Sequence, residues 1–257
     1  MNFEDHFSKL AGTYSKYRPY YPSTLYEYLA SCCNNHELAW DCGTGNGQAA
    51  IELAGYFDKV YATDASKEQI GNAEKHAKII YSIEPAGKVS LRTSSADLVT
   101  VAVAVHWFDF DKFYSEVNRI LKPGGIIAVW AYHLPIISSG VDSVLKKYYK
   151  ENLKGYWPER FHYLDECYRT LPFPFNELTP PEFKIKVEWN LDQLAGFLSS
   201  WSGTKNYVES TGHSPILDIW DDLKEVWGKE NHKHSIEWLL HMRIGKISQT
   251  DFSLNFN

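Results

Sequence analysis

The sequence has few cysteines and no long hydrophobic run. Its four cysteines, two of them adjacent, form no C-x-x-C pair, which favours reduced thiols in a reducing compartment over a disulfide framework. The longest apolar run, residues 98–105, is far shorter than the roughly 20 residues that span a bilayer. No apolar segment of a secretory signal precedes the first charged residues. We therefore expect a cytoplasmic protein that does not bind membranes.

An excess of basic residues is also missing. With 26 basic and 32 acidic residues the net charge is −6, which argues against a dedicated nucleic-acid binder because such a protein needs a dense basic face. The chain is instead hydrophobic enough to bury a core and unusually aromatic, at 15% with nine tryptophans. Aromatic walls around a small-molecule ligand are expected in addition to ordinary core packing. Whether the protein is a monomer or a homodimer stays open.

The first 130 or so residues alternate between strand-like and helix-like segments. Apolar, strand-like runs occupy residues 38–41, 60–64, 98–105 and 126–130. Helical patterns occupy residues 48–55, 66–78 and 110–121, and the last is stopped by Lys122-Pro123-Gly124-Gly125. Such alternation predicts an α/β fold with a doubly wound, mostly parallel sheet.

Beyond His133 the pattern is less regular and rich in proline, tyrosine and phenylalanine. Helices are predicted at 191–200 and 216–227, and strands at 183–189 and 238–243. We expect residues 1–132 to form an amino-terminal arm and a cofactor-binding core. Residues 133–247 would then form a lid and substrate elaboration together with the last strands of the same sheet. Residues 248–257 are expected to be a tail.

A glycine-rich segment between a strand and a helix is the sharpest local signal. Asp41-Cys42-Gly43-Thr44-Gly45-Asn46-Gly47 follows the first strand, and Asp64 ends the next one. Glycines at Gly43, Gly45 and Gly47 allow positive φ and let a ligand lie against the backbone. An acid at the position of Asp64 is suited to accept both hydroxyls of a ribose. The alternative is a tight turn whose glycines serve packing alone.

Two nucleotide cofactors fit this unit. A dinucleotide fingerprint, G-x-G-x-x-G counted from Gly43, would need glycine where Gln48 stands. The observed G-x-G-x-G behind an acid is the form used for S-adenosylmethionine, whose methionyl ammonium Asp41 can help to neutralise. A nicotinamide-dependent oxidoreductase is therefore the less favoured reading.

From these motifs the sequence resembles the class I S-adenosylmethionine-dependent methyltransferases of the type 11 group, near the trans-aconitate methyltransferase-like branch. Beside the glycine loop, the resemblance rests on these segments: Tyr14-Ser15-Lys16-Tyr17-Arg18-Pro19, Ala62-Thr63-Asp64-Ala65-Ser66, Asp97-Leu98-Val99-Thr100-Val101-Ala102, His106-Trp107-Phe108, Lys122-Pro123-Gly124-Gly125, Ser200-Trp201-Ser202 and Arg243-Ile244-Gly245. It implies a Rossmann-like methyltransferase fold with a seven-stranded sheet, amino-terminal helices and a carboxyl-terminal lid.

The resemblance also implies S-adenosylmethionine as cofactor and methyl transfer to a small molecule, through an oxygen of a carboxylate or a hydroxyl. The implied cofactor-binding residues are Tyr14, Arg18, Asp41, Gly43, Gly45, Gly47, Asp64, Ala65, Ala86 and Val103. The chain departs from the family in having Pro85-Ala86-Gly87 where an acid usually follows the third strand, and Val103 where the branch often has glutamine. These departures favour, as a second reading, a non-catalytic relative that binds a ligand or partner.

His106 is the catalytic candidate because it closes the predicted central strand at the edge where open α/β sheets bind ligands. It would orient or deprotonate the acceptor; a histidine bound to backbone under a lid is the alternative. His133 is a weaker rival, and His232 with His234 lacks the further ligands of a metal site, so no metal is expected.

Substrate contacts are predicted for five residues: Tyr17, Trp107, Trp130, Trp201 and Arg243. A carboxylate acceptor would be held by Arg18 and Arg243, since guanidinium binds carboxylate through two parallel hydrogen bonds. An aromatic or aliphatic acceptor on the same tryptophan and tyrosine surfaces is the competing prediction.

Overall fold

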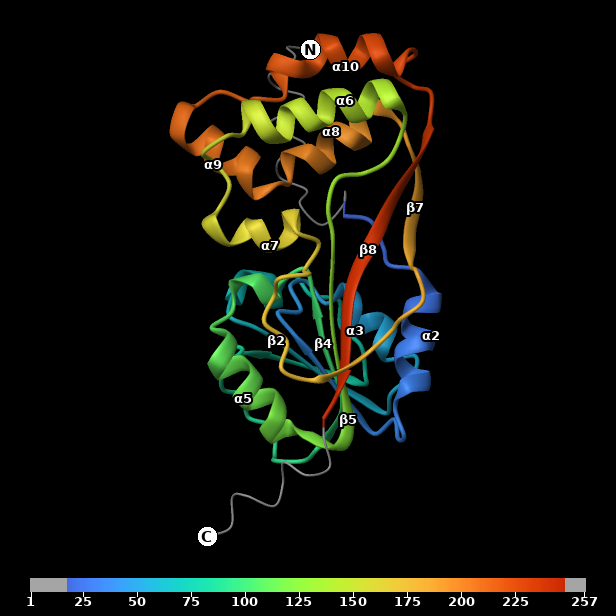
Figure 1. The fold of residues 1–257 in the computed structure, drawn as a ribbon, viewed down its shortest axis with the longest axis vertical. Helices are drawn as coiled ribbons and strands as arrows, with labels where there is room; N and C mark the ends of the chain where they lie inside the picture. Colours follow the sequence, from blue (N-terminus) through green and yellow to red (C-terminus); the bar gives the residue numbers. More distant parts are fainter. Residues whose placement is uncertain (1–17, 248–257) are drawn as a thin grey trace. The chain divides into compact units, whose positions relative to one another are not determined.

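The structure is a computed structural model that describes residues 18–247. The described chain forms two compact units, each built from separate stretches of sequence (Figure 1). We call one the sheet unit, which comprises residues 21–132, 162–183 and 240–247. The other, the helical unit, comprises residues 18–20, 133–161 and 184–239.

The sheet unit contains the strands of a doubly wound sheet, in the order β3-β2-β1-β4-β5-β8-β6. Pairing is parallel from β3 to β5 and antiparallel where β8 meets β5 and β6. The strands are β1 (Leu38–Cys42), β2 (Lys59–Asp64), β3 (Ile79–Ile83), β4 (Ala96–Ala102), β5 (Leu121–Tyr132), β6 (Asn176–Leu178) and β8 (His234–Lys246), whose second half lies in this unit. The predicted α/β class and its mostly parallel sheet are confirmed.

Helices cover both faces of this sheet. Helices α2 (Ser23–Cys32) and α3 (Gln48–Leu53) lie on one face and α5 (Phe110–Ile120) on the other (Figure 1). The first six residues of β4 are consequently buried, as a strand covered on both sides requires. On the α5 face, the ring centroids of Trp40 and Phe113 are 6.1 Å apart. The smaller α4 (Lys67–Gly71) and α7 (His162–Asp165) complete the unit.

Three predicted boundaries were wrong. The central strand ends at Ala102 because Val103 has a φ of 52°, outside the range of extended backbone. The helix predicted for 66–78 does start at its N-cap Ser66 but ends at Gly71, where glycine weakens a helix. Lys122-Pro123-Gly124-Gly125 belongs to β5, beside a register shift between β4 and β5 that accommodates the irregular segment.

The helical unit is built around aromatic side chains. Trp238 packs edge to face against Trp189 and Phe197, whose own rings are tilted to each other, and the three ring centroids are 5.2–5.8 Å apart. The elements are α6 (Ser139–Lys147), a π-turn (Tyr148–Asn152), a 3₁₀ turn (Glu159–Phe161), β7 (Lys184–Trp189), α8 (Leu191–Ser199), α9 (Ser202–Thr211), a 3₁₀ turn (Leu217–Ile219), α10 (Trp220–Trp227) and the first half of β8. Strand β7 pairs with that half antiparallel. Trp220 and Trp227 are buried in the core of this unit. The ranges of helices α6 and α9 were not predicted.

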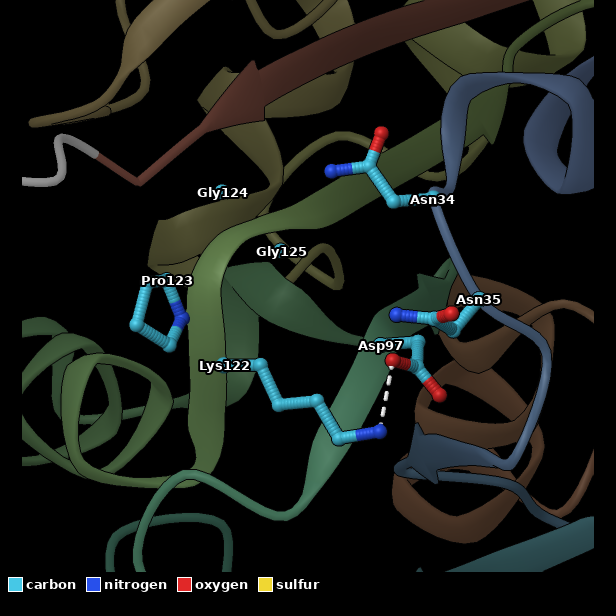
Figure 2. Close-up of a pocket in the computed structure, with 7 residues that line it drawn as sticks. All are labelled: Asn34, Asn35, Asp97, Lys122, Pro123, Gly124 and Gly125. Carbon is cyan, nitrogen blue, oxygen red and sulfur yellow. Dashed lines mark hydrogen bonds and ion pairs between the residues drawn. The ribbon is translucent and has the colours of Figure 1, made fainter.

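A small polar pocket lies at the amino ends of the parallel strands, the edge opposite the glycine loop (Figure 2). Lys122 contacts it and pairs with Asp97 at 2.8 Å and Glu37 at 2.6 Å. Asp97 in turn accepts hydrogen bonds from the backbone N–H groups of Glu37 and Leu38. The charged side chains and backbone N–H groups here are hydrogen-bonded to one another. They therefore link the starts of β1, β4 and β5. Among the described residues no helix has the length and hydrophobicity to cross a membrane.

Candidate active site

The three loop glycines have positive φ values but different reasons to lack a side chain. A Cβ on Gly43 would lie 2.7 Å from Ala104 Cβ, and one on Gly47 would lie 2.2 Å from the Tyr81 hydroxyl. These two glycines therefore let neighbouring segments approach the loop. Among residues 18–247, a Cβ at Gly45, where φ is 58°, would meet Gln69 Oε1 alone, at 3.8 Å. The open space beside Gly45 is the part of the loop against which a ligand can lie.

Asp64, at the end of β2, binds the glycine loop through one carboxylate oxygen and the start of α4 through the other. Its Oδ2 accepts the Gly45 N–H at 2.9 Å, and its Oδ1 accepts the Ser66 N–H at 2.8 Å. A carboxylate has about four lone-pair positions, so each oxygen retains a position for a further donor. Asp64 thus anchors the loop while it offers two acceptors beside Gly45.

Asp41, at the end of β1, is fully buried. Its Oδ1 accepts the Thr100 hydroxyl at 2.8 Å and its Oδ2 the Thr44 hydroxyl at 2.5 Å. Burial raises the pKa of Asp41 to about 6, although the hydrogen bonds from both threonines act to lower it. The side chain therefore ties β1, β4 and the glycine loop together, and its charge is sensitive to pH near neutrality.

Two tyrosines near Asp41 were missed by the sequence analysis. The hydroxyls of Tyr26 on α2 and Tyr81 on β3 are buried, and within residues 18–247 neither has a hydrogen-bond partner. Burial raises the pKa of both phenols, to about 12 for Tyr81, and the charge of Asp41 acts in the same direction. Buried hydroxyls are normally paired, so a polar ligand beside the loop would satisfy them. A polar residue on the buried face of the helix at 23–32 was the signal available for Tyr26.

Glu84, the acid that follows β3, is occupied by hydrogen bonds within its own turn. Glu84 accepts hydrogen bonds from the hydroxyls of Tyr61 and Ser82, each at 2.7 Å, and from the Ser90 N–H at 2.8 Å. Although burial opposes it, these bonds hold the pKa of Glu84 below its ordinary value. Glu84 therefore stabilises the turn that contains the half-buried Ala86. Ala65, which follows Asp64, is exposed at the neighbouring strand end.

The end of β4 brings a strained residue and a buried histidine together. Val103 donates its backbone N–H to the Trp130 carbonyl at 2.8 Å, and its positive φ turns the chain into the 3₁₀ segment Val105–Trp107. Such a conformation costs a β-branched residue on the order of 1–3 kcal/mol. His106 is 1% exposed, whereas the neighbouring Trp107 is 50% exposed. The strained turn thus buries the histidine and leaves the tryptophan at the surface.

His106 has a hydrogen-bond partner that no local sequence pattern predicts. Its Nδ1 lies 2.8 Å from the hydroxyl of Tyr168, which is fully buried and 62 residues away in sequence. Cys167 and Tyr168 follow α7 with φ values of 54° and 59°, and the Tyr168 N–H donates to the Tyr163 carbonyl at 2.8 Å. This left-handed turn directs Tyr168 back toward His106.

Trp130 and Arg243, both predicted substrate residues, lie on opposite faces of the sheet. Trp130 pairs with Met242 and Arg243 with Val129, and side chains alternate between faces along a strand. Trp130 is fully buried, and its ring meets that of Tyr21 edge to face at 5.6 Å.

The Arg243 guanidinium already has protein partners. Its Nε donates to Glu177 Oε2 at 3.0 Å, and its Nη groups donate to Glu177 Oε1 and the Leu171 carbonyl. The guanidinium also lies 4.8 Å from the centroid of the Phe173 ring. The structure therefore brings Trp107 and His106 together at one strand end and engages Arg243 with Glu177 on β6.

The other predicted residues lie outside the sheet unit. Arg18 and Trp201 belong to the helical unit, where Arg18 Nη2 is 3.5 Å from the Ser200 carbonyl and Trp201 is buried among aromatic rings. Tyr14 and Tyr17 lie outside the described residues.

Comparisons with known proteins agree on one family. Residues 40–129, which contain the glycine loop, Asp64 and His106, match the model of a methyltransferase domain of the type 11 group. A Dictyostelium discoideum protein named as a methyltransferase is 33% identical over 229 residues, covering 88% of this chain and 87% of that protein. A Saccharomyces cerevisiae protein named as an S-adenosylmethionine-dependent methyltransferase is 26% identical and covers 88% of this chain and 91% of its own.

Solved structures agree with this result. An Anaeromyxobacter dehalogenans protein named as a type II methyltransferase superposes with a TM-score of 0.83 at 36% identity, over 90% of this chain and 98% of that one. Similarity in both sequence and fold therefore extends over nearly the whole length of the two chains. The chain belongs to the class I S-adenosylmethionine-dependent methyltransferases.

Proposed function

We propose that this methyltransferase transfers the methyl group of S-adenosylmethionine to an oxygen atom of a small molecule. The observation that carries the proposal is the open side of the glycine loop, where Gly45 faces space that no residue of the described part of the chain fills, beside the two acceptor oxygens of Asp64. Both features stand at the carboxyl ends of β1 and β2, where ligands bind in open α/β sheets.

The residues at this edge fit the cofactor. Asp64 would accept the ribose hydroxyls, and the backbone of Gly43, Gly45 and Gly47 would pack against the ligand. Ala65, Ala86 and Val103 would line the adenosine. Asp41 is fully buried, so it would attract the methionyl ammonium through its negative charge and not through exposed contact. Arg18 and Tyr14 remain predicted cofactor contacts.

When bound, S-adenosylmethionine supplies a methyl group that is already a strong electrophile. The protein's own task is to align the acceptor oxygen in line with the departing sulfur and to exclude water. One lone pair of the acceptor oxygen forms the new C–O bond, and the electrons of the C–S bond remain on sulfur. A hydroxyl acceptor also loses its proton, whereas an ionised carboxylate has none to lose.

His106 and Trp107 are the proposed acceptor contacts, with Trp130 nearby in the sheet. Tyr17 and Trp201 remain predictions. A carboxylate acceptor is compatible with this proposal, as the resemblance to the trans-aconitate branch suggests. Arg243 is a poor candidate to hold it because Glu177 already accepts two of its N–H groups.

Calorimetry with S-adenosylmethionine, S-adenosylhomocysteine and NAD tests the cofactor, and we expect binding of the first two alone. Mass spectrometry of reactions with matched acids and alcohols, such as benzoate and benzyl alcohol, tests the acceptor. Methyl transfer exclusively to nitrogen or carbon atoms of the acceptors would refute the oxygen assignment. Binding of NAD in preference to S-adenosylhomocysteine would refute the cofactor assignment.

A further inference from the structure

The buried pair of His106 and Tyr168 determines which chemistry the histidine can perform. The two side chains are 1% and 0% exposed, and the Tyr168 hydroxyl lies 2.8 Å from His106 Nδ1. A neutral imidazole carries its proton on one nitrogen, so the direction of this hydrogen bond fixes the character of the other nitrogen.

The environment of Tyr168 sets that direction. Within residues 18–247, His106 Nδ1 is the single hydrogen-bond partner of the Tyr168 hydroxyl. Burial raises the pKa of Tyr168 well above its ordinary value, so the phenol keeps its proton. If the hydroxyl accepted from Nδ1–H, its own proton would be buried without an acceptor. If the hydroxyl donates to Nδ1 instead, only the lone pairs of the Tyr168 oxygen lack a partner. A buried acceptor without a partner costs less than a buried donor without one.

We infer that Tyr168 is a positioning residue that holds His106 in the tautomer with the proton on Nε2, so that His106 donates a hydrogen bond to the acceptor oxygen and does not remove its proton. This inference rests on the proposed function, because it assumes that the acceptor lies beside His106.

The inference contrasts with a general base. A basic Nε2 requires the proton on Nδ1, held by a carboxylate or carbonyl acceptor on that side. Tyr168 offers Nδ1 a donor instead. The left-handed turn at Cys167 and Tyr168 directs the phenol toward the ring, where its hydroxyl lies 2.8 Å from Nδ1.

The consequence is a restriction on the substrate. A donor at Nε2 orients and stabilises an oxygen that carries negative charge but cannot take a proton from an alcohol. The acceptor would therefore reach His106 already ionised, as a carboxylate or as an acidic phenol or enol.

The deciding experiment is a long-range ¹H–¹⁵N NMR spectrum of the full chain at pH 7.5, which distinguishes a protonated from an unprotonated ring nitrogen. The His106 signals are identified by their loss in His106→Gln. We expect a protonated Nε2 and an unprotonated Nδ1 in the wild type, and a larger share of the Nδ1–H form in Tyr168→Phe. A wild-type His106 with Nδ1–H, or with both nitrogens protonated, overturns the inference.

Activity toward benzoate, benzyl alcohol and 4-nitrophenol provides an independent measurement. Glutamine retains a donor near the position of Nε2–H but is not a base, so we expect His106→Gln to stay within about tenfold of the wild type and His106→Ala to lose roughly 100-fold. An equal loss on the order of 10²–10⁴-fold in both variants would indicate a base and overturn the inference.

Calorimetry with S-adenosylhomocysteine separates this inference from the proposed function. Wild-type protein that binds the ligand but shows the Nδ1–H tautomer contradicts the inference alone. Protein that is folded, shows the Nε2–H tautomer and fails to bind the ligand contradicts the proposed function instead.

Discussion

At the scale of single residues, Asp64 combines two roles that sequence alone does not separate. Its carboxylate holds the N–H groups of Gly45 and Ser66 and is also the proposed ribose acceptor. Asp64→Ala should therefore weaken S-adenosylhomocysteine binding by roughly 100-fold or more, since hydrogen bonds to a charged group contribute about 1.5–3 kcal/mol each. Calorimetry measures the affinity, and denaturant unfolding measures the stability.

Ser66→Ala is the matched control for this prediction. Ser66 accepts the Gln69 N–H at the start of α4 and has no proposed contact with the ribose. Loss of such a cap costs about 1 kcal/mol of stability. If both variants lose affinity to the same extent, the effect of Asp64 is structural and the ribose assignment fails.

Gly45 and Gly47 should respond differently to a side chain. Gly45→Val places its side chain in open space, so we expect ligand binding to be lost at a stability cost of roughly 1–2 kcal/mol from the positive φ. Gly47→Ala meets the Tyr81 hydroxyl and should mainly destabilise the fold. Gly155→Val is the control for the backbone cost: Gly155 lies in the helical unit at φ 84°, and no described residue lies within 4 Å of the added Cβ. If Gly45→Val bound S-adenosylhomocysteine with native affinity, the glycines of the loop would serve packing alone.

Asp41 predicts a pH dependence of stability. Burial raises its pKa in the folded protein to about 6 from the ordinary 3.8, so the folded state binds more protons than the unfolded state between these values. The free energy of unfolding contributed by this group is therefore greatest below about pH 4 and falls as the pH rises through 6, by about 3 kcal/mol in total. Asp41→Asn removes this decline.

Urea unfolding of wild type and Asp41→Asn at pH 4.5 and pH 7.5 measures the difference. The variant should gain stability relative to the wild type at the higher pH, because asparagine is never charged. A difference between the two proteins that does not change with pH would show that Asp41 ionises normally in the folded state.

At the scale of secondary-structure elements, Arg243 joins β8 to β6. Glu177 on β6 accepts its bidentate pair, and the Leu171 carbonyl accepts a further N–H group. Arg243→Leu should lower the free energy of unfolding by roughly 1–3 kcal/mol, at the lower end because Glu177 is half exposed. Affinity for S-adenosylhomocysteine should stay within twofold. A variant of native stability that no longer methylates its acceptor would restore the substrate role that the sequence suggested.

At the scale of the whole molecule, the two units are expected to unfold together. The chain passes repeatedly between them, and β8 contributes one half to each. The tryptophans at 157, 189, 201, 220, 227 and 238 all belong to the helical unit, so fluorescence reports mainly on it. The proposed cofactor contacts with defined geometry belong to the sheet unit.

S-adenosylhomocysteine at 100 times its Kd should add about 2.7 kcal/mol and raise the Tm by roughly 5–10 °C. We expect the same shift by circular dichroism and by tryptophan fluorescence. A fluorescence transition that the ligand leaves in place would show that the helical unit unfolds independently.

The sequence by itself determined the features that depend on neighbours along the chain. The alternation of strands and helices, the glycine loop and its acid, and the N-cap at Ser66 are local patterns of hydrophobic period and backbone freedom, so they can be read in order. The predicted α/β class followed from them. Strand and helix ends were less reliable because single backbone conformations, such as the positive φ of Val103, decide them.

Only the tertiary structure decided which distant side chains share a site. His106 meets Tyr168 across 62 residues and Arg243 meets Glu177 across 66, and no local pattern signals either pair. The register of β5 with β8 placed Arg243 and Trp130 on opposite faces, since a shift of one residue reverses the face of every side chain. The physical reason is that hydrogen-bond partners and burial depend on packing between segments, which the order of residues does not contain.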